Sequence, residues 1–189
     1  MSRSVIAILL LPLLLSSRLP VRTVHILPLG QVKQEHLQTV AKAVESYYGF
    51  RCVFRKPVPF KKDILSPSRT RYDADSILAK YRSDKNTLVV TESDITSRKG
   101  NIREWGVLGL GYINRNICVV STFRMGSVKG GKFNERLSKV AVHELGHNLG
   151  LNHCERRIPC LMSAGNGKAS SLDRSPMSLC THCRKAIGM

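Results

Sequence analysis

The apolar residues of this chain fall into two patterns. In short runs they alternate with polar residues, and in longer runs they recur with the spacing of a helix. Alternation and β-branched residues predict strands, and they do so at 21–27, 51–56, 87–91 and 117–122. Apolar residues three and four apart predict helices at 32–48, 73–81 and 135–149. Strands that alternate with helices favour a mixed α/β fold, in which a sheet packs on helices.

Turn and cap residues set the limits of these elements. Gly49 should end the first helix, Asp73 or Asp75 should cap the second, and Asn134 should cap the third. The segment 97–111 contains four glycines and is expected to be irregular. Its GVLGLG run lacks the Lys-Ser/Thr of a phosphate loop, so a nucleotide site is rejected.

The long third helix carries the most specific motif, HELGHNLGLNH at residues 143–153. Its first two histidines, His143 and His147, lie one turn apart on one helix face and can hold one zinc ion. Gly150 can turn the chain back, so that His153 completes three ligands and leaves the fourth position open to water. Glu144 is placed to act as general base on that water. The alternative is a buried helix with core histidines.

A second cluster of metal-binding residues begins at the next position. It comprises Cys154, Cys160, Cys180 and Cys183, the last two in a CTHC motif. Four thiolates form a closed tetrahedral site, so this zinc should fold the C-terminal segment rather than react. Two disulfides or four free thiols are the alternatives. Cys52 and Cys118 are expected to be buried, inert thiols.

Together these motifs resemble the archaemetzincin family of zinc peptidases. The family pattern is HExxHxxGxxHC, then CxM, seventeen residues and CxxC; this chain has HELGHNLGLNHC, CLM, a seventeen-residue gap (163–179) and CTHC. Five residues separate Cys154 from Cys160, against four in the family. The resemblance is most specific over 143–183 and continues back to about residue 21, with VHILPLG at 24–30.

The resemblance implies a zinc peptidase domain at 21–189 with one catalytic and one structural Zn²⁺. It assigns the catalytic zinc to the three histidines, the general base to Glu144 and the structural zinc to the four cysteines, with Met162 beneath the catalytic metal. It also implies a metzincin-like single domain, whose twisted, mostly parallel sheet has one antiparallel edge strand beside the substrate. The segment 111–122 is the expected edge, where a peptide would add as a further strand.

These features predict a zinc metallopeptidase that hydrolyses peptide bonds in peptide or protein substrates. Whether it is an endopeptidase or an aminopeptidase stays open. Two alternatives are a catalytically weak, zinc-stabilised binding protein and a basic zinc protein that binds nucleic acid. The intact Glu144 argues against the first, because an inactive relative often loses this residue.

Composition changes this picture little. The 189 residues include 30 Lys and Arg against 13 Asp and Glu, a net charge of +17. Because the basic residues are spread along the chain and are not interleaved with aromatics, a solvated basic surface is favoured and no specific nucleic acid is expected. The length suits one domain, and we expect a monomer.

The N-terminus is a hydrophobic extension, residues 1–20, outside the catalytic domain. Its apolar run 5–15 resembles a secretory signal with a poor cleavage site, and it is too short to span a bilayer as a helix. A membrane contact is expected only through this run. Thiolate zinc ligands persist best in a reducing compartment, so a cytoplasmic location is favoured over secretion or tethering.

Overall fold

The computed structural model describes residues 22–165 and 168–189, and the expected extension 1–20 lies outside them. The strands are β1 (Thr23–Leu29), β2 (Arg51–Phe54), β3 (Tyr72–Asp73), β4 (Thr87–Thr91), β5 (Ile95–Lys99), β6 (Ile102–Val107), β7 (Gly109–Gly111) and β8 (Ile117–Ser121). The helices are α1 (Gln34–Tyr48), α2 (Ala74–Lys80), α3 (Gly130–Asn148) and α4 (Thr181–Ala186), with 3₁₀ turns η1 (Lys62–Ile64) and η2 (Ala169–Arg174).

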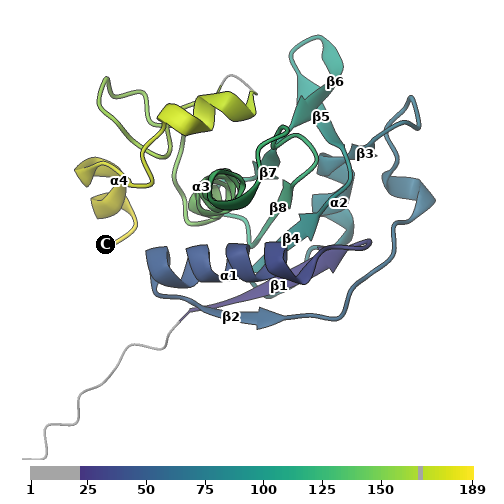
Figure 1. The fold of residues 1–189 in the computed structure, drawn as a ribbon, viewed down its shortest axis with the longest axis horizontal. Coiled ribbons are helices and arrows are strands. Elements are labelled where there is room, and N and C mark those ends of the chain that lie inside the picture. Colours follow the sequence, from purple (N-terminus) through teal and green to yellow (C-terminus); the bar gives the residue numbers. More distant parts are fainter. Residues whose placement is uncertain (1–21, 166–167) are drawn as a thin grey trace, which may run out of the picture.

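A five-stranded sheet with the order β2-β1-β4-β8-β7 forms the centre of the fold (Figure 1). Four of its strands are parallel, and only the edge strand β7 runs antiparallel, beside β8. The strands β3, β5 and β6 form a second small sheet, in which β5 and β6 make an antiparallel hairpin. The twisted mixed sheet of the metzincin-like fold is confirmed.

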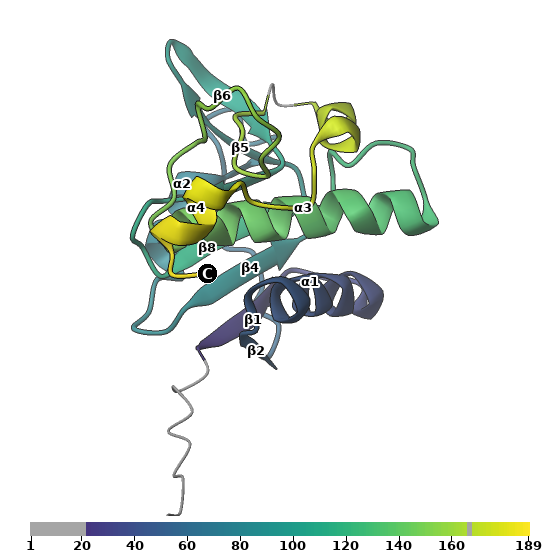
Figure 2. The same ribbon diagram turned by 90° about the vertical axis from the view of Figure 1, so that its left-hand side faces the viewer.

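The parallel strands of the large sheet carry apolar side chains on both faces of the sheet. Helices therefore cover both faces. The α1 and α3 helices pack on one face against residues such as Val24, Val90 and Val120, whereas α2 packs on the other against Val89 and Val119. Figure 2 shows α3 running along the sheet above α1, with the C-terminal segment folded over α3. The site helix is therefore held between the sheet and this segment.

Most of the predicted elements are confirmed. The helix α1 ends at Gly49, and the Asp73 side chain caps α2 by accepting from the Ser76 N–H at 2.7 Å. Cys118 is fully buried as expected, while Cys52 is only partly buried.

Three predictions are wrong. The segment 97–111 is not irregular: it forms the end of β5 and the strands β6 and β7. Three of its glycines, Gly106, Gly109 and Gly111, stand in strands that pack closely on their neighbours. The antiparallel edge is therefore β7 rather than 111–122, most of which belongs to the interior strand β8 and the loop before it. Asn134 does not cap α3, since the helix begins four residues earlier, at Gly130.

The C-terminal segment beyond Cys154 has little regular structure, and an ion pair connects it to α3. The buried Arg136 guanidinium donates through Nε and Nη2 to both carboxylate oxygens of Asp173 in η2, each at 2.7 Å. Arg136 and Lys132 hold the pKa of Asp173 well below its usual range. Such a bidentate pair fixes geometry as well as supplying energy.

In the described part of the chain, no helix is both long and apolar enough to cross a membrane.

We expect Asp173→Asn to lower the midpoint of thermal unfolding at pH 7, because it leaves the buried Arg136 charge without a carboxylate. Circular dichroism measures this shift. Lys132→Met is the matched control: it removes a half-exposed cation from the same carboxylate and should cost much less. Equal midpoints for wild type and Asp173→Asn would contradict a structural role for the pair.

Candidate active site

The first two histidines of the motif lie where the sequence predicts, one turn apart on α3. The Nε2 atoms of His143 and His147 are 3.2 Å apart, and their ring centroids are separated by 4.8 Å. A tetrahedral zinc with bonds of about 2.0–2.1 Å places neighbouring nitrogens about 3.3 Å apart, so the observed spacing suits two ligands of one ion.

The chain reverses directly after α3 and brings in the third histidine. Gly150 has φ 102°, a backbone conformation that favours glycine, and its N–H donates to His147 O at 2.9 Å. The His153 ring then lies 5.4 Å from the His143 ring and 4.9 Å from the His147 ring, centroid to centroid. One ligand atom from each of the three histidines lies within 4.8 Å of the others. The predicted cluster is therefore assembled.

Backbone carbonyls set which nitrogen of the α3 histidines faces the cluster. His143 Nδ1 lies 2.8 Å from Leu161 O, and His147 Nδ1 lies 2.7 Å from Leu151 O. A carbonyl only accepts, so Nδ1 carries the proton and Nε2 presents a lone pair, which is how metal-binding histidines are usually oriented. Burial lowers the pKa of His143 to about 4. The hydrogen bond to Leu161 O opposes this shift, and the neighbouring imidazoles add to it. The ring is therefore neutral at pH 7, as a metal ligand must be.

The four cysteines of the second cluster also come together, from two segments far apart in sequence. Cys154 Sγ and Cys180 Sγ are 3.8 Å apart, as are Cys160 Sγ and Cys183 Sγ. A disulfide requires about 2.05 Å, whereas a tetrahedron with zinc–sulfur bonds of about 2.3 Å has edges near 3.8 Å. The Cys180 N–H also donates to Cys160 Sγ at 3.3 Å. The donor set and spacing thus fit zinc better than two disulfides.

Short contacts connect the two clusters. His153 and Cys154 are adjacent in sequence, and the Cys154 N–H donates to Met162 O at 2.7 Å. Met162 is fully buried against α3: a Cβ placed on Gly146 would lie 2.7 Å from its Sδ. The loop that carries His153 is therefore held between the cysteine cluster and the underside of the histidine helix.

Glu144 is buried between α3 and the edge strand β7. Burial raises the pKa of its carboxyl to about 8, against the opposing effect of the Gly111 N–H, which donates to the carboxylate. The strand approaches this closely because two of its residues lack side chains. A Cβ on Gly109 would lie 2.7 Å from Glu144 Cγ, and one on Gly111 would lie 2.5 Å from Glu144 O.

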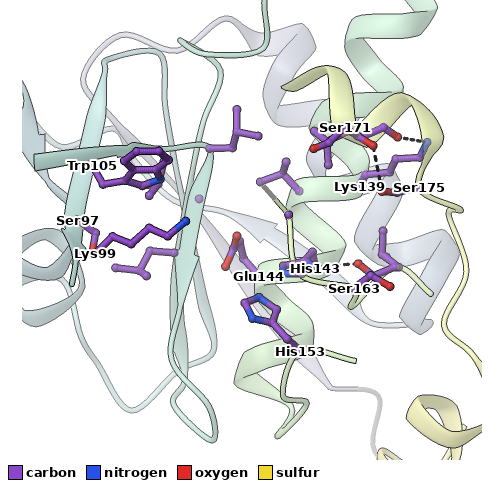
Figure 3. A pocket seen from close by; sticks show the side chains of 18 of the residues that line it. Ser97, Lys99, Trp105, Lys139, His143, Glu144, His153, Ser163, Ser171 and Ser175 are labelled. Atoms are coloured by element: carbon purple, nitrogen blue, oxygen red, sulfur yellow. Dashed lines mark hydrogen bonds between the residues drawn. The ribbon is translucent and has the colours of Figure 1, made fainter. Parts of the chain in front are cut away.

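A cavity of about 370 Å³ opens beside Glu144 (Figure 3). It lies between the β5–β6 hairpin, which contributes Lys99 and Trp105, and α3, which contributes Lys139 and His143. A second space of about 330 Å³ lies along residues 109–113 and also reaches His143, Glu144 and His153. Open space therefore extends from the histidine cluster in two directions.

Sequence reasoning missed Gly109 and Gly111, which it placed in an irregular segment. Two glycines two positions apart fall on one face of a strand, and that spacing could have indicated a close backbone approach. It also missed Leu151 and Leu161, whose contribution comes from main-chain carbonyls and leaves no side-chain signal in the sequence.

Two histidines on α3, a third just beyond it and a buried glutamate beside an edge strand are the residues that the active site of a zinc peptidase requires. Residues 57–188 match the family model described as Peptidase family M54. The chain belongs to this family and is a zinc-dependent peptidase that acts on peptide substrates.

Named relatives agree with this assignment. The archaemetzincin of Halobacterium salinarum is 28% identical over 176 residues, which cover 87% of this chain and 98% of the relative. The archaemetzincin of Archaeoglobus fulgidus is 36% identical over 120 residues, covering 64% of this chain and 71% of the relative.

Two crystal structures show the same fold. The archaemetzincin of A. fulgidus complexed with malonate superposes with a TM-score of 0.77 at 28% identity and covers 87% of this chain and 99% of that one. The archaemetzincin of Methanopyrus kandleri gives 0.73 at 22% identity, with 89% and 94% covered.

We expect Gly111→Ala to destabilise the protein by about 1–3 kcal/mol, because the new methyl group must push β7 off α3. Turnover should fall as well, since the Gly111 N–H moves away from Glu144. Urea unfolding and peptide cleavage measure the two effects. Gly131→Ala, in the first turn of α3 with open space around it, should be neutral or slightly stabilising. Equal behaviour of the two variants would contradict close packing at β7.

Proposed function

We propose that His143, His147 and His153 bind the catalytic zinc and that Glu144 is the general base of peptide-bond hydrolysis. The observation that carries this proposal is the convergence of three imidazoles beside a buried carboxyl at the mouth of a cavity. A zinc ion held there lowers the pKa of a water molecule to about 7 and polarises the scissile carbonyl.

Glu144 takes the proton of the attacking water and later returns it to the leaving nitrogen. Its position suits both transfers, because the Gly111 N–H orients the carboxyl, which lies next to the histidines at the mouth of the cavity.

The substrate binds as an added strand on the free edge of β7. β7 pairs on one side with β8 and is the last strand of its sheet in the described part of the chain. Its other edge is available to peptide N–H and C=O groups. Because open space extends from the histidines in two directions, a peptide can pass through the site, which favours an endopeptidase.

Cys154, Cys160, Cys180 and Cys183 bind a second, structural zinc, giving two ions per chain. Support comes from the sulfur spacing and from the scarcity of regular structure in the segment they hold, which needs a cross-link to fold. We further propose one catalytic domain at 21–189, acting as a monomer in the cytoplasm, with residues 1–20 outside it.

Glu144→Ala should keep both zinc ions and lose about 10²–10⁴-fold in turnover, because only proton transfer is removed. Cleavage of a broad peptide library, with metal content matched by elemental analysis, measures this loss. Glu144→Gln serves as a second variant that preserves the size of the side chain. Turnover by either variant at the wild-type rate would remove Glu144 from the mechanism.

Cys180→Ser should reduce bound zinc from two ions to one and lower the unfolding midpoint, because a structural zinc contributes folding free energy directly. Native mass spectrometry and thermal unfolding read the two effects. Cys52→Ser, at a thiol outside the cluster, is the matched control and should keep both ions. A Cys180→Ser protein that retains two zincs and full stability would refute the structural site.

A further inference from the structure

We propose that the 370 Å³ cavity beside Glu144 selects an acidic side chain on the residue that follows the scissile bond, and that Lys99 determines this selection. The inference rests on the proposed function and deepens it by naming the substrate class, peptides with Glu or Asp at that position.

The cavity is placed to receive a side chain next to the bond that is cut. It begins at His143, Glu144 and His153 and continues between the β5–β6 hairpin and the C-terminal segment. Its inner surface is mostly apolar and includes Val107, Leu161 and Leu172. Its volume is near the lower end of ordinary ligand pockets, about 300–1,000 Å³, and so suits one side chain rather than a bulky ligand.

The direction of β7 indicates which substrate residue enters. The cavity lies beside residues 105–110, the end of β6 and the start of β7, whereas the second space lies beside residues 109–113. A peptide paired antiparallel with β7 runs the opposite way. Its residues after the scissile bond therefore lie beside residues 105–110, at this cavity.

The charges around the cavity are unbalanced. Lys139 lies on the α3 wall, but its buried ammonium is paired with Glu135 and donates to Leu172 O at 2.8 Å. The β5–β6 hairpin contributes Arg98 and Lys99, and among the described residues neither forms an ion pair with a carboxylate. Among the described residues that line the cavity, Glu144, at the mouth, is the only acidic one. A substrate carboxylate would supply the missing partner of Lys99.

An aromatic ring keeps the Lys99 ammonium at the wall. Its Nζ lies 4.7 Å from the centroid of Trp105, a cation–π contact that favours this position over free movement in solvent. Figure 3 shows both side chains on the side of the cavity opposite Lys139. The carboxylate of Asp75 does not line the cavity. It accepts hydrogen bonds from Ser97 Oγ, at 2.7 Å, and from the Tyr112 hydroxyl. Lys99 is exposed to solvent, but the contact with Trp105 restricts where its ammonium lies.

A peptide library that varies the residues around the cut tests the proposal. Wild type should cleave before Glu or Asp about two- to fivefold faster than before Gln or Asn, the range expected for an exposed charge pair. Lys99→Met should bring this ratio close to one, and Lys99→Glu should shift the preference to Lys or Arg. Lys56→Met, an exposed lysine away from the cleft, should keep the wild-type ratio.

A binding measurement separates this proposal from the peptidase assignment. Trp105 is the only tryptophan in the chain, so its fluorescence reports occupancy of the cavity. The zinc-loaded Glu144→Ala protein is titrated with two peptide pools that differ only in Glu or Gln at the selected position. Tighter binding of the Glu pool, lost on adding Lys99→Met, supports the proposal even if turnover fails. Equal binding of the two pools, or an acid preference that survives Lys99→Met, overturns it.

Discussion

The active site depends on how one histidine outside the helix is held in place. α3 fixes His143 and His147 relative to each other, but His153 belongs to a segment with almost no regular structure. Three contacts restrain that segment: the turn at Gly150, the bond from Cys154 N–H to Met162 O, and the cysteine cluster that starts at Cys154. If the cysteines bind zinc as we propose, a structural ion positions a ligand of the catalytic one, one backbone step away.

The second constraint is the close packing of β7 on α3. Gly109 and Gly111 let the strand lie against Glu144, and the same strand offers its free edge to the substrate. If Glu144 is the general base and the peptide pairs with β7, as we propose, one three-residue element holds both of them. Such rigid placement is what lets positioned groups accelerate a reaction without reorganising at each turnover.

Sequence patterns predicted the parts of this structure that depend on interactions between residues close in sequence. The alternation in β1 and β4, the helical spacing in α1 and the HExxHxxGxxH motif each reflect interactions within a few residues, and each was found. The strands β6 and β7 were missed because their glycines are explained only by distant residues: Gly106 lies against the Arg124 side chain, and Gly109 and Gly111 lie against α3. The carbonyls of Leu151 and Leu161 and the pair Arg136–Asp173 depend on chain segments far apart in sequence, which no local pattern shows.

The measurement that tests the two-site account most directly is anomalous diffraction at the zinc edge from crystals of the protein. We predict two peaks per chain, one among His143, His147 and His153 and one among the four cysteines, with a single step of backbone between the coordination spheres. A map with metal at the histidines alone, and with disulfides or free thiols at the cysteines, would contradict the claim that a structural zinc holds the third catalytic ligand.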